Sequence, residues 1–250
     1  MWEYSITFEN INYANSFKDS LYNIIKSHNG VITSLKQENF TKVLIAVPII
    51  ERFKIHNLIR EKIAENILLN YKKDFIVSKL EFDINQNLNM QVFLKALVVF
   101  DSDTDKEIII ERMKFDSNLV VNSFINFKLS FLKRKWRELI ALANDNSMYL
   151  LNNDSFDELI KFLISNLEYR YHTINIFSKQ DCYLLYDTAG SVVNDFLVDK
   201  NIVYDDNHLL TSLVALNPEK IIVHCNSFVK DKLIKTLYDY FSNRVHICKS

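Results

Sequence analysis

The sequence predicts an α+β protein with an N-terminal β-α-β-β-α unit, a helical middle and a C-terminal α/β unit that contains a parallel strand pair. Alternating or β-branched apolar segments lie near both ends, and apolar residues with helical spacing fill the middle. Near the C-terminus one helix separates two strands, which implies that those strands run parallel. The expected regions are 1–118, 119–170 and 171–250. The alternative that they pack into one globule stays open.

The N-terminal region shows five elements with clear boundary signals. In chain order they are a strand at 3–8, a helix at Ala14–His28, strands at Val31–Leu35 and Thr41–Val47, and a helix at Glu51–Tyr71. Asn29-Gly30 ends the first helix and Pro48 ends the third strand. The second helix carries one apolar stripe, made of Ile55, Leu58, Ile59, Ile63, Ile67 and Leu68.

The middle of the chain is predicted to be mostly helical. Residues 72–118 are ambiguous, because "VFLKALVVF" and "KEIIIERMKF" fit either a strand or a helix. A single long amphipathic helix is clearer, with a stripe of Ile125, Leu129, Leu132, Trp136, Leu139 and Ala143. Asp154 or Ser155 is expected to cap a following helix at Phe156–Leu167.

The last eighty residues read as an α/β unit. The expected elements are paired strands at Thr173–Phe177 and Cys182–Tyr186, a turn at Asp187–Gly190, helices at 191–198 and 206–216, a strand at Lys220–Cys225, a helix at Phe228–Phe241 and a strand at Arg244–Cys248. Asn217-Pro218 marks a turn between the second helix and the following strand, and Ser227 is the expected N-cap of the last helix.

The chain contains only two glycines, Gly30 and Gly190. A Walker A loop needs two glycines in one short motif, and a dinucleotide-binding fingerprint needs three. Standard P-loop NTPases and Rossmann dehydrogenases are therefore excluded. Backbone positions with positive φ are expected to fall largely to asparagine, with Asn29, Asn144 and Asn243 as candidates.

Charge, cysteine content and hydropathy favour a cytoplasmic protein. The formal net charge is -1, so no global field favours nucleic acid or an anionic membrane. Three scattered cysteines without a CxxC motif do not form a disulfide framework. The N-terminal residues lack a secretory signal pattern, and the apolar runs are shorter than the ~20 residues that span a bilayer.

Histidine and cysteine residues gather at the carboxyl ends of the last two predicted strands. His224 and Cys225 end one strand, and His246 and Cys248 end the other. Ligands often bind at this edge of a parallel sheet, and the helix N-terminus at Ser227 would favour a thiolate. However, neighbouring strand residues point to opposite faces, and buried cysteines often serve as small apolar residues. Core packing is the preferred interpretation, with a thiol or metal site as the alternative.

One concentration of basic residues lies in "FKLSFLKRKWREL". Its members are Lys128, Lys133, Arg134, Lys135 and Arg137. Basic helices can bind nucleic acid. Phe131 and Trp136 fall on or beside the apolar stripe, which favours a core position for the aromatic rings and simple solvation for the charges. Elsewhere, no spacing indicates paired catalytic carboxylates, a Ser/His/Asp set or a GxSxG elbow.

Several segments of the C-terminal half resemble the YtxC-like family, whose members are assigned to sporulation. The matching segments are "VNSFINFKL", "FDELIKFLI", "LLTSLVALNPEKIIVHC" and the final "RVHIC". The resemblance implies an endospore-forming Gram-positive bacterium and a cytoplasmic role in sporulation, and it supplies no substrate, cofactor or catalytic residue. The helix after "FKL" is basic where relatives are expected to be more acidic, and the chain ends two residues after Cys248.

These observations predict a cytoplasmic accessory or interaction protein of sporulation without enzymatic activity, whose partner is another protein. No cofactor or metal is expected. Nucleic-acid binding through the basic helix is the first alternative, and a thiol or metal site at His224, Cys225 and Cys248 is the second.

Overall fold

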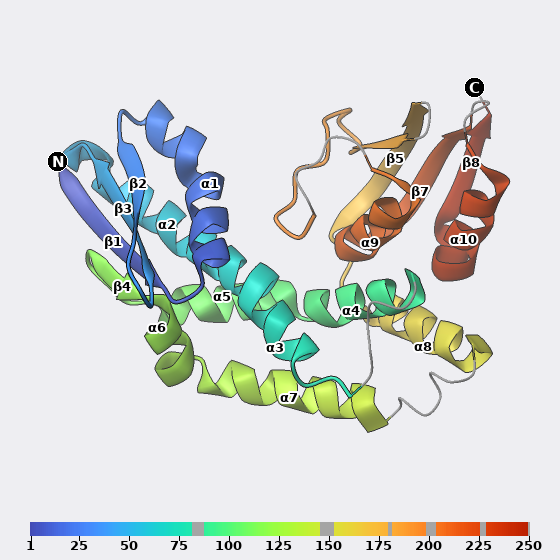
Figure 1. Cartoon of the computed structure of the whole chain (residues 1–250). Coiled ribbons are helices and arrows are strands. Elements are labelled where there is room, and N and C mark those ends of the chain that lie inside the picture. Colours follow the sequence, from blue (N-terminus) through green and yellow to red (C-terminus); the bar gives the residue numbers. More distant parts are fainter. Residues whose placement is uncertain (82–87, 146–152, 180–181, 199–203, 226–228, 250) are drawn as a thin grey trace. The chain divides into compact units, whose positions relative to one another are not determined.

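The computed structural model of the chain describes residues 1–81, 88–145, 153–179, 182–198, 204–225 and 229–249 (Figure 1). It confirms an α+β fold with two mixed sheets. The chain divides into two compact units that each combine two segments. Unit 1 comprises Met1–Ile76 and Ser102–Leu139, and unit 2 comprises Val77–Asp101 and Ile140–Ser250.

Unit 1 is built on a four-stranded sheet of order β2-β3-β1-β4. Its first elements are β1 (Trp2–Phe8), α1 (Ile11–Ser27), β2 (Val31–Lys36), β3 (Thr41–Val47), the 3₁₀ turn η1 (Ile49–Glu51) and α2 (Arg52–Asn66). β3 lies between β1 and β2 and is antiparallel to both, which confirms the predicted β-α-β-β-α unit. β4 (Asn118–Val120), which the sequence did not predict, joins β1 in parallel.

The core of unit 1 follows from strand alternation. Tyr4, Ile6 and Phe8 of β1 point to one face of the sheet and are fully buried. They meet the apolar stripe of α1, where the rings of Phe8 and Phe17 lie 5.3 Å apart. The opposite face is solvated, and Val31 and Leu35 of β2 are 61% and 50% exposed there.

The helices of unit 1 differ from the predicted ones in two places. The predicted helix at Glu51–Tyr71 continues from α2 into a π-helix, η2 (Ile67–Lys72), and then into α3 (Lys73–Val77). The first seven residues of the ambiguous segment "KEIIIERMKF" belong to α5 (Ser102–Arg112). The prediction of one long helix through Leu129 is wrong, because α6 (Val121–Lys128) ends there and α7 (Ser130–Asp145) begins after it. Leu129 is fully buried between them.

Asparagine occupies only some of the positions with positive φ. Asn29 has a φ of 54° and ends α1 as predicted, but Asn144 and Asn243 have negative φ, so those predictions are wrong. Asn144 lies inside α7, where helical φ is required. Asp101, Asn217 and Ser242 take the remaining positive-φ positions among the described non-glycine residues. Gly30 follows Asn29, and a Cβ there would lie 2.8 Å from the Ala46 carbonyl oxygen.

Unit 2 contains a second sheet of order β6-β5-β7-β8. Its elements are α4 (Leu88–Val99), α8 (Asn153–Asn166), β5 (Tyr171–Lys179), β6 (Cys182–Tyr186), α9 (Asp206–Leu216), β7 (Pro218–Cys225), α10 (Asp231–Phe241), the 3₁₀ turn η5 (Ser242–Arg244) and β8 (Val245–Lys249). β5 and β6 form the predicted strand pair, which is antiparallel, and β7 and β8 form the predicted parallel pair. β7 also pairs in parallel with β5.

Two local predictions in unit 2 fail, and the start of the last helix differs from its predicted position. Residues 191–198 form no helix, because Val192 bridges to Tyr186 and Asp195 Oδ1 accepts from the Leu197 amide at 2.9 Å in a tight turn. α8 begins at Asn153, so neither Asp154 nor Ser155 is its N-cap. α10 begins only at Asp231, after Lys230, and the predicted cap Ser227 lies outside the described residues.

Polar side chains fix both ends of α9. Asp205 caps α9, where Oδ1 accepts from the His208 amide at 2.8 Å, and this bond lowers the pKa of the carboxyl. At the other end Asn217 has a φ of 33° and is fully buried. Its Nδ2 donates to the carbonyl oxygens of Leu167 and Glu168, and Arg244 donates to its Oδ1 at 2.8 Å.

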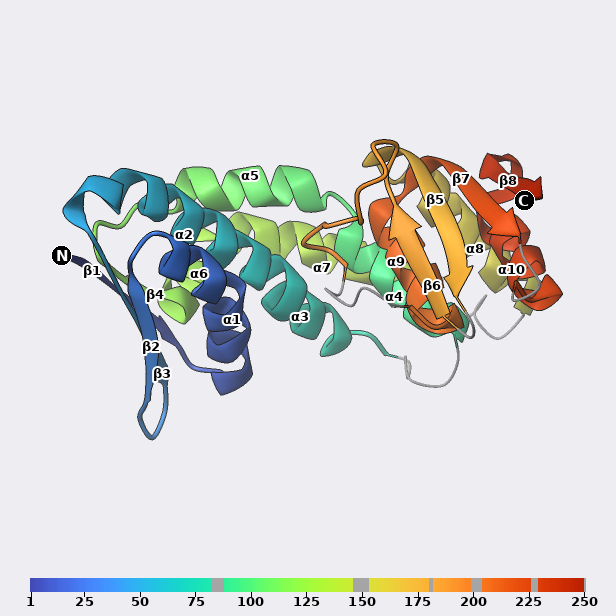
Figure 2. The ribbon, with the colours of Figure 1, turned by 90° about the horizontal axis from the view of Figure 1, so that it is seen from above.

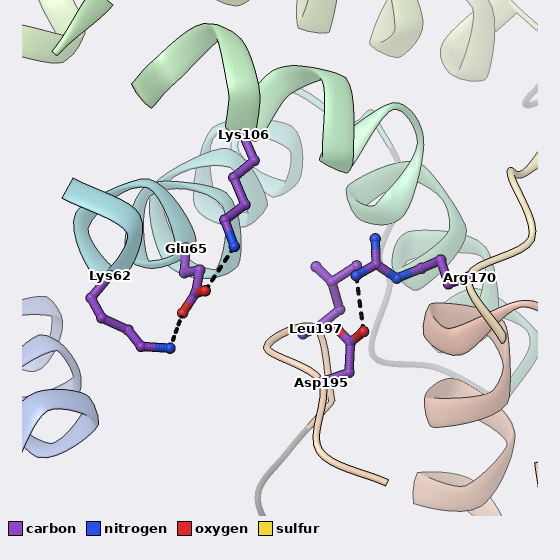
Figure 3. Close-up of polar contacts among 6 residues, drawn as sticks. All are labelled: Lys62, Glu65, Lys106, Arg170, Asp195 and Leu197. Atoms are coloured by element: carbon purple, nitrogen blue, oxygen red, sulfur yellow. Dashed lines mark hydrogen bonds and ion pairs between the residues drawn. The ribbon is translucent and has the colours of Figure 1, made fainter. Parts of the chain in front are cut away.

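Each unit also holds an ion pair that joins two segments of the chain (Figure 3). In unit 1, Glu65 accepts from Lys62 at 2.6 Å and from Lys106 at 2.8 Å, which joins α2 to α5. In unit 2, Arg170 binds Asp195 at 2.9 Å, so the turn at Asp195 is tied to the start of β5. Among the helices that the structure describes, none is long and apolar enough to span a bilayer.

Candidate functional site

The open face of the unit 2 sheet gathers half-exposed side chains from four strands. Strand alternation and the pairing register place these residues on one face. The set, which we call the open-face cluster, consists of Asn175, Phe177, Leu184, Tyr186, Ile222, His224, His246 and Cys248. All are half-buried or exposed, whereas Ile174, Ile176 and Val223 on the other face are fully buried. In Figure 2 the strands lie in front of α4, α8 and α9.

His224 lies at the centre of the cluster and is held by β5. Its ring stacks on Phe177, with centroids 4.1 Å apart and an interplanar angle of 7°. Tyr186 meets the other side of Phe177 edge-on, at 5.5 Å. These ring contacts fix the orientation of three side chains on a rigid sheet.

Asn175 sets the tautomer of His224. The amide nitrogen Nδ2 of Asn175 donates to the Asp187 carbonyl oxygen at 3.4 Å, so Oδ1 faces the imidazole. His224 Nε2 lies 3.0 Å from that Oδ1. Because an amide oxygen can only accept, Nε2 donates in this contact, and Nδ1 is a hydrogen-bond acceptor in the neutral form of the ring. The cluster therefore combines apolar surface with one oriented polar group.

The residues of the predicted thiol site are divided between the two faces. His224 and Cys248 are partners across β7 and β8, so their side chains share the open face. Cys225 is the next residue of β7 and points to the opposite face. The structure therefore brings one thiol beside the imidazole and separates the other from it. Among the described residues, no group of three His, Cys, Asp or Glu side chains is arranged to hold a metal ion.

The five predicted basic residues do not share one face. Lys133 and Arg137 lie over the Phe75 ring, each 5.9 Å from its centroid. Lys135 lies on the other flank of α7, 3.4 Å from Asp105, and Lys128 is exposed at the end of α6.

The two aromatic residues interleaved with these basic residues differ in burial. Trp136 is 1% exposed, as expected for a core residue, but Phe131 is 45% exposed, so its expected core position is wrong. Arg134 lies 5.4 Å from the Phe131 ring. Exposed rings beside cations are the combination found on nucleic-acid-binding surfaces.

Sequence reasoning missed Asn175 and Phe177. Both lie in the predicted strand Thr173–Phe177, and their contact with His224 depends on the pairing of β5 with β7. The sequence predicted that β5 pairs with β6 and β7 with β8, but it did not predict the pairing of β5 with β7. The one local signal was a polar residue, Asn175, between two buried isoleucines of a strand, a position that strands rarely give to asparagine.

Comparisons with known proteins identify a family and no individual relative. The model of the YtxC-like family matches residues 45–246. None of the curated proteins and none of the solved structures compared with the chain matches it. The matched range contains the whole open-face cluster apart from Cys248.

Proposed function

The chain belongs to the YtxC-like family, and from this premise we propose that it acts in the cytoplasm during sporulation as an accessory protein that binds another protein rather than as an enzyme. The resemblance of its C-terminal segments to proteins assigned to sporulation supports the setting. The observation that carries the binding role is the open-face cluster, which presents oriented aromatic and apolar side chains on one side of a sheet.

The chemistry of the cluster favours a protein as its partner. Interfaces derive most of their affinity from a few aromatic anchors in well-packed surroundings. Phe177 is 39% exposed and already fixed by His224 and Tyr186, so binding would freeze little additional motion. Nδ1 of His224 adds a hydrogen-bond acceptor with a defined direction. The matching surface is an apolar side chain next to a donor such as a backbone amide.

Replacing Phe177 by serine is expected to weaken the partner complex by at least ~30-fold, since a central aromatic anchor contributes about 2 kcal/mol or more. The measurement is quantitative affinity purification from sporulating cells. Phe162→Ser is the matched control, because Phe162 is 63% exposed on α8 of the same unit and outside the cluster. Equal recovery of the same proteins by both variants and the native chain would contradict the proposal.

Nucleic-acid binding through α7 is a second candidate, favoured by the position of Lys133 and Arg137 over the half-exposed Phe75 ring. The double variant Lys133→Glu/Arg137→Glu is expected to abolish retention on single-stranded nucleic acid at low salt. A smaller change, Lys133→Gln/Arg137→Gln, is expected to reduce the slope of log K against log salt by about 1–2. Lys232→Glu/Lys235→Glu on α10 gives the same charge change elsewhere. Binding that is absent at low salt, or that the control weakens equally, rejects this candidate.

A further inference from the structure

β2 forms an outer edge of the unit 1 sheet and lacks the usual protection of such an edge. It pairs with β3 only, and among the described strands none lies on its other side. Natural edge strands are commonly guarded by proline, a bulge or inward-facing charge. β2 contains no proline, and its register with β3 runs without a bulge from Val31 to Lys36. Its only charged residue, Lys36, lies on the same face as Ile32 but at the last position of the strand, where it is exposed, so it guards only that end of the edge.

The exposed side chains of β2 are self-complementary. An antiparallel pair of two β2 strands related by a twofold axis through Thr33 places each Thr33 opposite its copy. Val31 of each strand then lies opposite Leu35 of the other, and both residues remain on the solvated face of the sheet. Val31 is 61% exposed and Leu35 is 50% exposed. The pairing therefore removes these exposed apolar side chains from water in two equivalent Val31–Leu35 contacts.

The helix above this edge adds a further exposed aromatic side chain. α1 packs on β2 and β3 with α2 on its other side. Tyr13 marks the side that faces α2 and its continuation α3, because its hydroxyl donates to the Asp74 carboxylate of α3. Tyr22 lies nine residues later, which at about 100° per residue is half a turn away and so on the β2 side. It is 41% exposed.

We propose that the chain forms a homodimer by antiparallel pairing of β2 with β2 of a second copy, in the register that sets Thr33 opposite Thr33. The pairing joins the two unit 1 sheets into one eight-stranded sheet and satisfies the outward backbone donors and acceptors of both edges. The β2–β3 hairpin projects past the end of α1 in Figure 2, and β2 is the outer strand of the sheet.

A cysteine scan along β2 tests both the dimer and its register. Residues directly opposite in an antiparallel pair have Cα atoms about 4.5–5.5 Å apart, within disulfide range. Mild oxidation of the Thr33→Cys variant is expected to give a 33–33 linked dimer, identified by peptide mass spectrometry, at least ~10-fold faster than Ser34→Cys gives a 34–34 link. Mapping the link separates it from links through the native cysteines.

Charge-swapped variants provide a second readout that keeps the backbone unchanged. In the proposed register, a copy with Val31→Lys and a copy with Leu35→Glu form an ion pair across the edge. Mixing them is expected to give heterodimers in preference to either homodimer, as measured by native mass spectrometry. A chain that stays monomeric at all concentrations in sedimentation, or equal cross-linking at positions 33 and 34, overturns the proposal.

Discussion

Replacing Asp105 by alanine is expected to lower the free energy of unfolding of unit 1 by about 3–5 kcal/mol, because it leaves a buried ammonium group without its counter-ion. The side chains of Lys72 and Asp105 are both fully buried, and Lys72 Nζ lies 2.9 Å from Asp105 Oδ2. The indole nitrogen of Trp136 donates to the same oxygen at 2.8 Å. One carboxylate thus joins the π-helix η2, α5 and α7.

The double variant Lys72→Met/Asp105→Leu is expected to be clearly more stable than Asp105→Ala. It removes both buried charges, and the remaining loss is the unsatisfied Trp136 N–H, at about 1–3 kcal/mol. Urea unfolding followed by tryptophan fluorescence measures this, because both tryptophans, Trp2 and Trp136, lie in unit 1.

The control for this prediction is the exposed ion pair between Arg52 and Asp116, which is 2.6 Å long with an Asp116 side chain that is 73% exposed. Asp116→Ala is expected to change the stability by less than about 1 kcal/mol. If Asp105→Ala is no more destabilising than Asp116→Ala, the buried pair does not hold the three helical segments together.

Replacing Asn217 by alanine is expected to destabilise unit 2 by about 3–5 kcal/mol, because it introduces backbone strain and leaves several polar groups unpaired. The left-handed conformation at φ 33° is unfavourable for alanine. In addition, the carbonyl oxygens of Leu167 and Glu168 lose their donor, and Arg244 loses one of its two acceptors.

Asn217→Gly separates these two causes. Glycine tolerates the left-handed conformation but makes none of the side-chain hydrogen bonds, so it is expected to recover only about 1 kcal/mol relative to alanine. Hydrogen exchange of the β5 and β7 amides reports the stability of this unit. Asn207→Ala, an exposed change on α9, is the control and is expected to be nearly neutral. Equal protection in all three variants would show that the Asn217 contacts add nothing.

The Asn217 contacts also give a physical meaning to the segments that resemble the YtxC-like family. One segment supplies α9, Asn217 and β7, and the other supplies Arg244 and β8. Arg244 binds the side chain of Asn217 and lies 4.8 Å from the Tyr169 ring. The two segments are thus in direct contact within unit 2.

Local signals predicted the fold best where the sequence marks both ends of an element, with an N-cap residue before it and a helix-ending residue after it. α9 matches the predicted range 206–216, because Asp205 caps it and Asn217-Pro218 ends it. Residues 191–198 lacked such signals, and there tertiary contacts of Val192 and Asp195 replaced the predicted helix.

Other features were hidden because they depend on packing between distant segments. The apolar stripe through Ile67 and Leu68 fits α-helical spacing, so it gave no sign of a π-helix with its hydrogen bonds from i to i+5. Lys72 stands in a run of polar residues and resembles a surface lysine until α5 brings Asp105 against it. Asn175 and His224 are far apart in sequence, and only the order of strands in the sheet joins them.

The alternation of the two units along the chain has a consequence for synthesis on the ribosome. The strands β1–β3 emerge first, but unit 1 also needs Ser102–Leu139. Val77–Asp101, which carries α4, is made in between and belongs to unit 2, whose remaining segment begins at Ile140. The apolar stripe of α4 therefore leaves the ribosome long before α8 and α9, its packing partners, exist. During that interval the nascent chain exposes a surface that chaperones bind.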